Sequence, residues 1–176
     1  MKFSLIIIII ILLPIVVWIA MDFFNIIFRG FAPLVISRQK TIDLILDIIK
    51  PQPQQVIYEL GSGSAKFLQM AEKKFPEVKL IGLEYSIIPF LFFSLVLRLK
   101  KSRIKIRLQN IFKANLQDAD FIYCYLLPAM MPKLGAKIRS ECKPGAMLIS
   151  YLFSIPNWEP KQIIKQDNGA IYFYEV

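Results

Sequence analysis

Short apolar runs alternate with longer amphipathic stretches along most of this chain, and the two patterns predict strands and helices respectively. Strands are predicted at residues 56–60, 79–84, 104–109, 120–127, 146–153, 162–166 and 171–176. Helices are predicted at residues 38–50, 66–75, 87–99 and 130–143. Because strands and helices alternate, we expect an α/β fold with a parallel sheet and helices on both faces. Asn168-Gly169 between the last two strands predicts a C-terminal antiparallel hairpin.

The stretch 56–86 carries the most informative pattern. Gly61 and Gly63 directly follow the first strand, and Glu84 ends the second strand 23 residues after Gly61. These glycines permit a tight turn in which no Cβ blocks an approaching ligand. In such a unit a nucleotide-like ligand lies over the turn, and the acid binds two ribose hydroxyls. The alternative is an ordinary βαβ unit, and the dinucleotide-binding pattern lacks its third glycine because Lys66 stands there.

The N-terminal part of the chain contains 19 residues without a charge, from Phe3 to Met21. At about 1.5 Å per residue, such a helix nearly crosses a hydrocarbon layer of roughly 30 Å. We therefore expect a transmembrane anchor at residues 1–28 and one domain at residues 29–176, with a cleaved signal peptide as the alternative. More cations follow the span than precede it, which predicts a single-pass membrane protein whose domain is cytoplasmic.

Composition excludes several kinds of chemistry. The chain has 176 residues, a net charge of +9 and no histidine, so a histidine general base, a histidine-dependent zinc site and a Ser-His-Asp triad are excluded. Cys124 and Cys142 have no metal-ligand spacing, and no metal is expected. The cations scatter over the predicted helices and form no strip interleaved with aromatic residues, which argues against a nucleic-acid partner.

The predicted helix 87–99 has two interpretations. Its apolar run is too short to span a bilayer and ends in a cluster of cations at residues 98–103. A core helix with a solvated basic end is the favoured interpretation. The alternative is a helix that rests on a membrane, with apolar residues in lipid and basic residues on anionic headgroups. The alternating strand 104–109 that follows is predicted to be half-buried and at a sheet edge.

Several motifs together resemble a known enzyme family. They are Glu59-Leu60-Gly61-Ser62-Gly63-Ser64-Ala65-Lys66, Gly82-Leu83-Glu84, Gln109-Asn110-Ile111-Phe112, Tyr125-Leu126-Leu127-Pro128-Ala129-Met130-Met131 and Pro156-Asn157-Trp158-Glu159-Pro160. The first two resemble motif I and the following acid of class I S-adenosylmethionine-dependent methyltransferases. As a whole the chain resembles the membrane-anchored protein-lysine methyltransferases related to the enzyme that methylates the ATP-synthase c subunit. This resemblance implies a Rossmann-like seven-stranded sheet and S-adenosyl-L-methionine as cofactor.

The resemblance also implies which residues bind the cofactor. Glu59 is expected to hold its methionine end and Glu84 its ribose, beside the turn formed by Gly61, Ser62 and Gly63. Tyr85 is expected either to contact the adenine or to cap the core. Asn110, followed by Ile111, stands where the family usually has an acid that contacts the adenine amino group, and an amide oxygen still accepts that hydrogen bond. Further departures are Ser64-Ala65-Lys66 after the second glycine and Asn157 in place of a histidine.

The acceptor side of the site is expected at the end of the fourth strand. Tyr125, Leu126 and Pro128 lie there and are the expected catalytic residues, because an apolar, aromatic pocket favours the neutral form of a lysine amine. Trp158, after the next strand, is expected to form the other wall, with a packing anchor between two prolines as the alternative. Methyl transfer needs alignment and exclusion of water but no covalent intermediate with the enzyme.

The leading hypothesis is a membrane-anchored methyltransferase that acts on a lysine side chain of a protein, and the anchor favours a membrane protein as that substrate. The first alternative is a methyltransferase for a lipid, a quinone or another small membrane-associated molecule. The second alternative is a non-catalytic binding module docked on a membrane. Cofactor affinity separates the enzyme hypotheses from the binding module.

Overall fold

The computed structural model describes residues 10, 12–14, 16–17, 20, 37–167 and 169–176. Most of the expected membrane-spanning run 3–21, and the expected domain boundary after residue 28, lie outside these described residues. Among the residues that are described, no helix is long and apolar enough to cross a membrane. The description below concerns residues 37–167 and 169–176.

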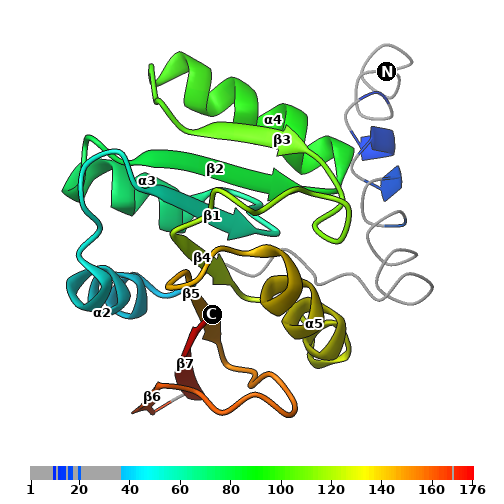
Figure 1. Cartoon of the computed structure of the whole chain (residues 1–176). Coiled ribbons are helices and arrows are strands. Elements are labelled where there is room, and N and C mark those ends of the chain that lie inside the picture. Colours follow the sequence, from blue (N-terminus) through cyan, green and yellow to red (C-terminus); the bar gives the residue numbers. More distant parts are fainter. Residues whose placement is uncertain (1–9, 11, 15, 18–19, 21–36, 168) are drawn as a thin grey trace. The chain divides into compact units, whose positions relative to one another are not determined.

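A seven-stranded sheet forms the centre of the fold, with the strand order β3-β2-β1-β4-β5-β7-β6 (Figure 1). The strands are β1 (Val56–Leu60), β2 (Lys79–Glu84), β3 (Lys105–Leu108), β4 (Phe121–Cys124), β5 (Met147–Tyr151), β6 (Gln162–Gln166) and β7 (Gly169–Glu175). The pairs among β1 to β5 are parallel. The second strand of the hairpin, β7, lies between β5 and β6 and runs antiparallel to both. The seven-stranded Rossmann-like sheet with a C-terminal hairpin is thereby confirmed.

Helices cover both faces of this sheet, as the alternating pattern predicted. They are α2 (Gln39–Ile49), α3 (Lys66–Lys74), α4 (Ile87–Leu99) and α5 (Met131–Glu141), with a short 3-10 helix, η1 (Pro128–Met130), before α5. Figure 1 shows α3 and α4 on one face and α5 on the other. A loop without a helix, residues 109–120, connects β3 to β4. This loop, in place of a helix, brings Asn115, Gln117 and Asp118 beside Tyr58 of β1 and Arg107 of β3.

The core between α3 and the central strands is organised by an aromatic stack. The amphipathic pattern of α3 turns Phe67, Leu68 and Ala71 inward, and all three are fully buried. The ring of Phe67 stacks on Tyr123 of β4 with ring centroids 4.1 Å apart. The hydroxyl of Tyr123 lies 2.5 Å from that of Ser37, just before α2. Burying a side chain such as Phe67 stabilises the fold by about 2–3 kcal/mol. Together, the aromatic stack and the Ser37 contact join α2, α3 and β4 in one packed unit.

The prediction for α4 was wrong in one respect. Its bounds are the predicted ones, but only Pro89 and Leu97 of its 13 residues are buried. The helix packs against β2 and β3, at the edge of the sheet, so its outer side has no second layer to pack against among the described residues. A core helix, as the sequence favoured, would need elements on both sides.

The two edge strands carry exposed cations. Strand β3, which was expected at an edge, exposes Lys105 and Arg107. Strand β6 forms the opposite edge and exposes Lys165. Strand β4 is shorter than predicted and ends at Cys124, because the chain leaves the sheet there and turns into η1 at Pro128.

Candidate active site

The glycine turn lies at the carboxyl end of β1 and is fastened to the neighbouring strand. Gly61 and Gly63 have φ values of +71° and +47°, a region that glycine adopts without strain. The amides of Gly61 and Ser62 both donate to the Leu83 carbonyl at 2.9 Å. A Cβ on Gly61 would lie 3.0 Å from a methyl group of Leu126. The turn and the chain after β4 therefore approach closely, and the positive φ at Gly61 favours glycine there.

Glu84 ends β2 directly beside this turn. Its carboxylate accepts hydrogen bonds from the amides of Gly63 and Ser86, each at 2.8 Å, and only 8% of the residue is exposed. A carboxylate offers about four acceptor positions, so two such bonds leave capacity for a further pair of donors. The structure thus brings Glu84 and the glycine turn together, as the sequence predicted.

Glu59 is the second acid of the site and is enclosed by the core. It is 7% exposed, and the Leu68 amide at the start of α3 donates to its carboxylate at 3.3 Å. Burial raises the pKa of Glu59 to about 8, and the amides of Leu68 and Phe67 counteract this only in part. The side chain is therefore mostly protonated at neutral pH until a positive charge comes near it.

Ser62 contributes an unsatisfied polar atom to the turn. Its Oγ is buried and has no hydrogen-bond partner among the described residues. A Cβ added to Gly82 of β2 would lie 2.8 Å from both Cβ and Oγ of Ser62. Gly82 thus makes room for Ser62, a positional role that no sequence motif had assigned to it. The signal in the sequence that could have indicated this role was a glycine, without a side chain, in the middle of a buried strand.

Tyr85, Asn110 and Ile111 lie at the same edge of the sheet. Tyr85 follows Glu84 and is exposed, whereas Ile111 is buried. The Gln109 amide donates to the Glu84 carbonyl at 2.8 Å, which holds the start of the 109–120 loop at the end of β2. The Asn110 Oδ1 accepts from the Phe112 amide at 2.9 Å and so forms a local turn. The three residues predicted for the adenine side therefore share one edge with Glu84.

The predicted acceptor residues follow the end of β4. The ring of Tyr125 meets that of Tyr151 edge to face, with centroids 4.9 Å apart. Leu126 is buried and reaches toward Gly61, and Pro128 opens η1. Burial raises the pKa of Tyr125, so its hydroxyl is protonated at neutral pH. Of the predicted acceptor residues, Leu126 therefore borders the glycine turn, and Tyr125 contributes an aromatic pair beside it in the chain.

Trp158 makes its ring contacts elsewhere. Its ring centroid lies 5.1 Å from that of Tyr174, and the guanidinium of Arg139 lies 5.2 Å from its centre. Tyr174 pairs with Leu148, near the start of β5, whereas Tyr151 ends that strand. These contacts fit the packing-anchor alternative. That Trp158 forms a wall of the substrate pocket stays a prediction.

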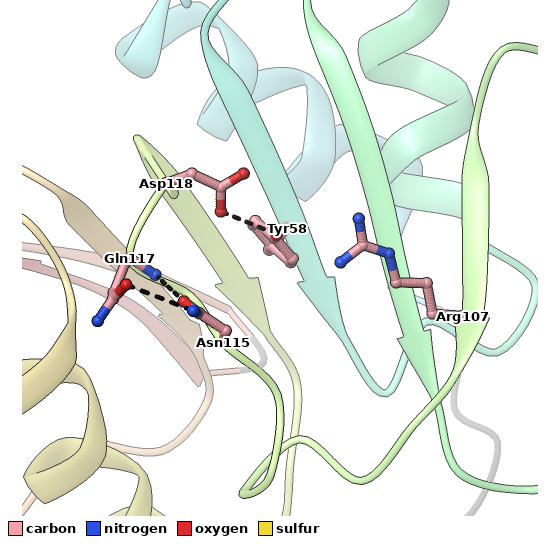
Figure 2. Close-up of a pocket in the computed structure, with 5 residues that line it drawn as sticks. All are labelled: Tyr58, Arg107, Asn115, Gln117 and Asp118. Carbon is pink, nitrogen blue, oxygen red and sulfur yellow. Dashed lines mark hydrogen bonds between the residues drawn. The ribbon is translucent and has the colours of Figure 1, made fainter.

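A cavity of about 250 Å³ lies apart from these candidate site residues. It is lined by Tyr58, Arg107, Asn115, Gln117 and Asp118. Figure 2 shows the side chain of Arg107 reaching from its strand toward Tyr58, whose hydroxyl donates to Asp118 at 2.9 Å. Burial, with the Asp118 contact, raises the pKa of Tyr58 to about 12. No sequence motif indicated this cavity, because its walls come from two strands and a loop that only the folded sheet brings together.

The comparison with protein families identifies a domain that spans this whole site. The model of the ANTKMT methyltransferase domain matches residues 59–162, which include every candidate site residue from Glu59 to Trp158. Within residues 37–167 and 169–176, no group of three or more His, Cys, Asp or Glu side chains is placed to hold a metal ion.

Several similar sequences are named as lysine N-methyltransferases. A protein-lysine N-methyltransferase of Saccharolobus islandicus is 28% identical over 152 residues, which cover 82% of this chain and 93% of that protein. The adenine nucleotide translocase lysine N-methyltransferase of Mus musculus is 21% identical, and the match covers 82% of this chain and 63% of that protein. A lysine N-methyltransferase of the ATP synthase c subunit, from Xenopus laevis, is 22% identical, with 69% and 54% covered.

Solved structures agree on the fold. An RNA methyltransferase from Salinibacter ruber, in complex with S-adenosyl-L-homocysteine, superimposes with a TM-score of 0.76 at 20% identity, covering 81% of this chain and 94% of that one. A precorrin-6y C5,15-methyltransferase from Geobacter metallireducens has a TM-score of 0.64 at 14% identity, covering 84% and 94%. The predicted class, an S-adenosylmethionine-dependent methyltransferase, is confirmed. The chain belongs to the ANTKMT methyltransferase domain family.

Proposed function

We propose that this chain transfers a methyl group from S-adenosyl-L-methionine to a lysine side chain of another protein. The observation that carries the proposal is the meeting of the glycine turn, Glu59 and Glu84 at one edge of the sheet. The names of the relatives from S. islandicus, M. musculus and X. laevis support lysine as the acceptor.

The residues at this edge fit the cofactor. Glu84 has acceptor capacity for the two ribose hydroxyls, and the buried Ser62 hydroxyl still lacks a partner among the described residues. Glu59, with Gly61 and Gly63, would receive the methionine end. Tyr85, Asn110 and Ile111 would border the adenine. The cofactor supplies a methyl group on a positively charged sulfur, which needs no metal to become electrophilic.

The acceptor amine must arrive without its proton. Leu126 is buried and the Tyr125 ring packs against Tyr151, so these two side chains would give little solvation to an ammonium group and would lower the pKa of a lysine held there. Pro128 lies exposed beside them. The lone pair of the neutral amine forms the new nitrogen–carbon bond while the sulfur–carbon bond breaks in line with it. The methylated ammonium product then loses a proton to water. The contribution of the chain is alignment and exclusion of water.

Membrane anchoring is a further part of the proposal. The uncharged run 3–21 supports a single membrane-spanning helix within residues 1–28, with the domain over residues 29–176 on the cytoplasmic side. An anchor confines the search for a substrate to the membrane surface, so the protein substrate is proposed to be a membrane protein. A lipid, quinone or other small membrane-associated acceptor is the alternative.

The first experiment titrates the full chain with S-adenosylmethionine by calorimetry and compares Glu84→Gln with Glu77→Gln. Glu77 is an exposed acid in the turn before β2, so it controls for the loss of one charge. Since a hydrogen bond to a charged group contributes about 1.5–3 kcal/mol, loss of the ribose contacts is expected to weaken binding about a hundredfold. Equal affinity of both variants would reject the role of Glu84.

The second experiment follows the methyl group. Labelled cofactor is added to the enzyme with membranes, and label is measured separately in protein lysines and in extracted lipids and small molecules. Label in lysine supports the proposal, whereas label only in the extract favours the small-molecule alternative. Absence of cofactor binding by the folded chain in the first experiment would leave the non-catalytic binding module as the better hypothesis.

A further inference from the structure

The outer side of α4 presents a continuous apolar surface. Six side chains recur at helical spacing and are 40–76% exposed; we call them the α4 stripe: Ile87, Ile88, Leu91, Phe92, Leu95 and Leu99. Single exposed apolar residues are ordinary, but a contiguous stripe on one helix marks an interaction surface. At about 20 Å for 13 residues, α4 is too short to cross a bilayer, so the stripe is suited to lie along a surface.

Positive charge surrounds the end of this stripe. From Tyr85 to Gln117 the chain has seven Lys or Arg residues and no Asp or Glu. Four of these cations lie in the last turn of α4 or directly after it, and all four are exposed: Arg98, Lys100, Lys101 and Arg103. The nearby acid is Glu72 of α3, which lies 3.9 Å from Arg103. An occupant of this surface must therefore accept apolar side chains and carry negative charge beside them.

We propose that the α4 stripe and the four cations beside it dock on an anionic lipid bilayer. A bilayer surface offers hydrocarbon to the α4 stripe and anionic headgroups to the cations, since headgroup charge lies directly above the hydrocarbon. A second copy of the chain would bring the same cations to the contact and gain no charge complementarity. The inference concerns this surface alone and does not depend on methyl transfer.

The direction of α4 gives the docking a consequence for the candidate site. The helix starts at Ile87, three residues after Glu84, and returns toward the start of β3. Figure 1 shows it running alongside β2 and β3. The first residues of the stripe thus lie next to the edge that holds the glycine turn. Docking through α4 would hold the site opening at the level of the membrane surface.

The test places a fluorescent label on Phe92→Cys in the full chain and measures quenching by spin-labelled lipids in vesicles. Ile163→Cys is the matched control, because Ile163 is also an exposed hydrophobic residue, 50% against 59%, and lies on the opposite edge strand β6. Cys124 and Cys142 are buried, so the unmodified chain treated in the same way gives the background. Both labelled chains carry the same residues 1–36, so any membrane anchor there is common to the two measurements.

Docking predicts strong quenching at position 92 and little at position 163, in vesicles that contain phosphatidylglycerol. Replacing Lys100 and Lys101 by Gln is expected to weaken the docked state about thirtyfold at low salt, since each cation near an anionic surface contributes about a fivefold preference. The matched variant replaces Lys161 and Lys165 of the opposite edge by Gln, which removes the same charge, and is expected to leave the quenching unchanged.

Three outcomes would overturn the proposal. Equal quenching of the two labels would show that α4 has no special contact with lipid. A label at position 92 that is shielded without vesicles, and more so at higher protein concentration, would assign the stripe to a second copy. Shielding without vesicles that does not change with concentration would assign it to another segment of the same chain.

Discussion

The Gly63 amide donates a hydrogen bond to the Glu84 carboxylate across 2.8 Å, and this contact joins two residues that are 21 positions apart in the sequence. Glu84 also accepts the Ser86 amide at 2.8 Å, so one side chain fixes both the glycine turn and the chain that leaves β2. The acid proposed to bind the ribose is therefore also a structural support of the turn. Its replacement should affect stability as well as binding.

The first prediction concerns this support. Glu84→Ala removes two hydrogen bonds to a charged group and is expected to lower the free energy of unfolding by about 3 kcal/mol. Denaturant unfolding without cofactor measures the change. Glu77→Ala, an exposed acid, should change the free energy by less than about 0.5 kcal/mol. Similar losses in both variants would show that the contacts of Glu84 add nothing to stability.

The second prediction concerns the pH dependence of stability. The pKa of Glu59 in the folded protein is about 8, above its usual value of 4.5, because the carboxyl is buried. The stability contribution of this group is therefore fully present below pH 4.5 and is lost as the pH rises to about 8. Glu59→Gln should flatten that dependence and stabilise the protein at pH 8 by up to about 4 kcal/mol relative to the parent chain. An unchanged pH profile would contradict the raised pKa.

The third prediction links Glu59 to the cofactor. A methionine ammonium beside the carboxyl would favour its charged form, so cofactor binding at pH 7 should release close to one proton. Calorimetric titrations in buffers of different ionisation enthalpy count that proton. Glu59→Gln should abolish most of the release. Release that persists in this variant would place its source at another group.

The fourth prediction tests the packing of Ser62 on Gly82. The added Cβ of Gly82→Ala would lie 2.8 Å from that of Ser62, so the variant should lose about 1–3 kcal/mol of stability through overpacking. Ser62→Gly in the same chain removes the opposing Cβ and should recover a large part of the loss. Chemical unfolding of the single and double variants measures the coupling. Additive losses would mean that the two residues do not press on each other.

The fifth prediction separates the ring of Tyr125 from its hydroxyl. The ring packs against Tyr151, whereas the site proposal requires no proton transfer from the phenol. Tyr125→Phe should keep kcat within about threefold, and Tyr125→Ala should lower it by about tenfold or more because alignment in the pocket is lost. Single-turnover rates of labelled methyl transfer measure both. A large loss in Tyr125→Phe would indicate a role for the hydroxyl.

The sequence predicted most of the fold because its elements are local and strongly patterned. The bounds of α4 and of β6 are the predicted ones, and the inward positions Leu134 and Ile138 of α5 are fully buried. The glycine turn and Glu84 could be placed together because both lie at carboxyl ends of adjacent parallel strands, a relation that follows from chain connectivity.

Features that depend on packing between distant parts of the chain could not be predicted from the sequence. Apolar content cannot distinguish a helix buried in a core from one at a sheet edge, so α4 was assigned to the core. The contact of Trp158 with Tyr174 depends on how β7 inserts beside β5, which no local pattern reveals. For the same reason the cavity lined by Tyr58, Arg107 and Asp118 had no counterpart in the sequence motifs.

The cations on the edge strands have a consequence for the behaviour of the protein at high concentration. An edge strand offers unpaired backbone groups to any other strand, and lysine or arginine there makes such pairing unfavourable. Lys105 and Arg107 protect β3, and Lys165 protects β6, so both open ends of the sheet resist extension into fibrous aggregates. A protein with so many exposed apolar residues on one helix would otherwise have two routes to aggregation; its edges close one of them.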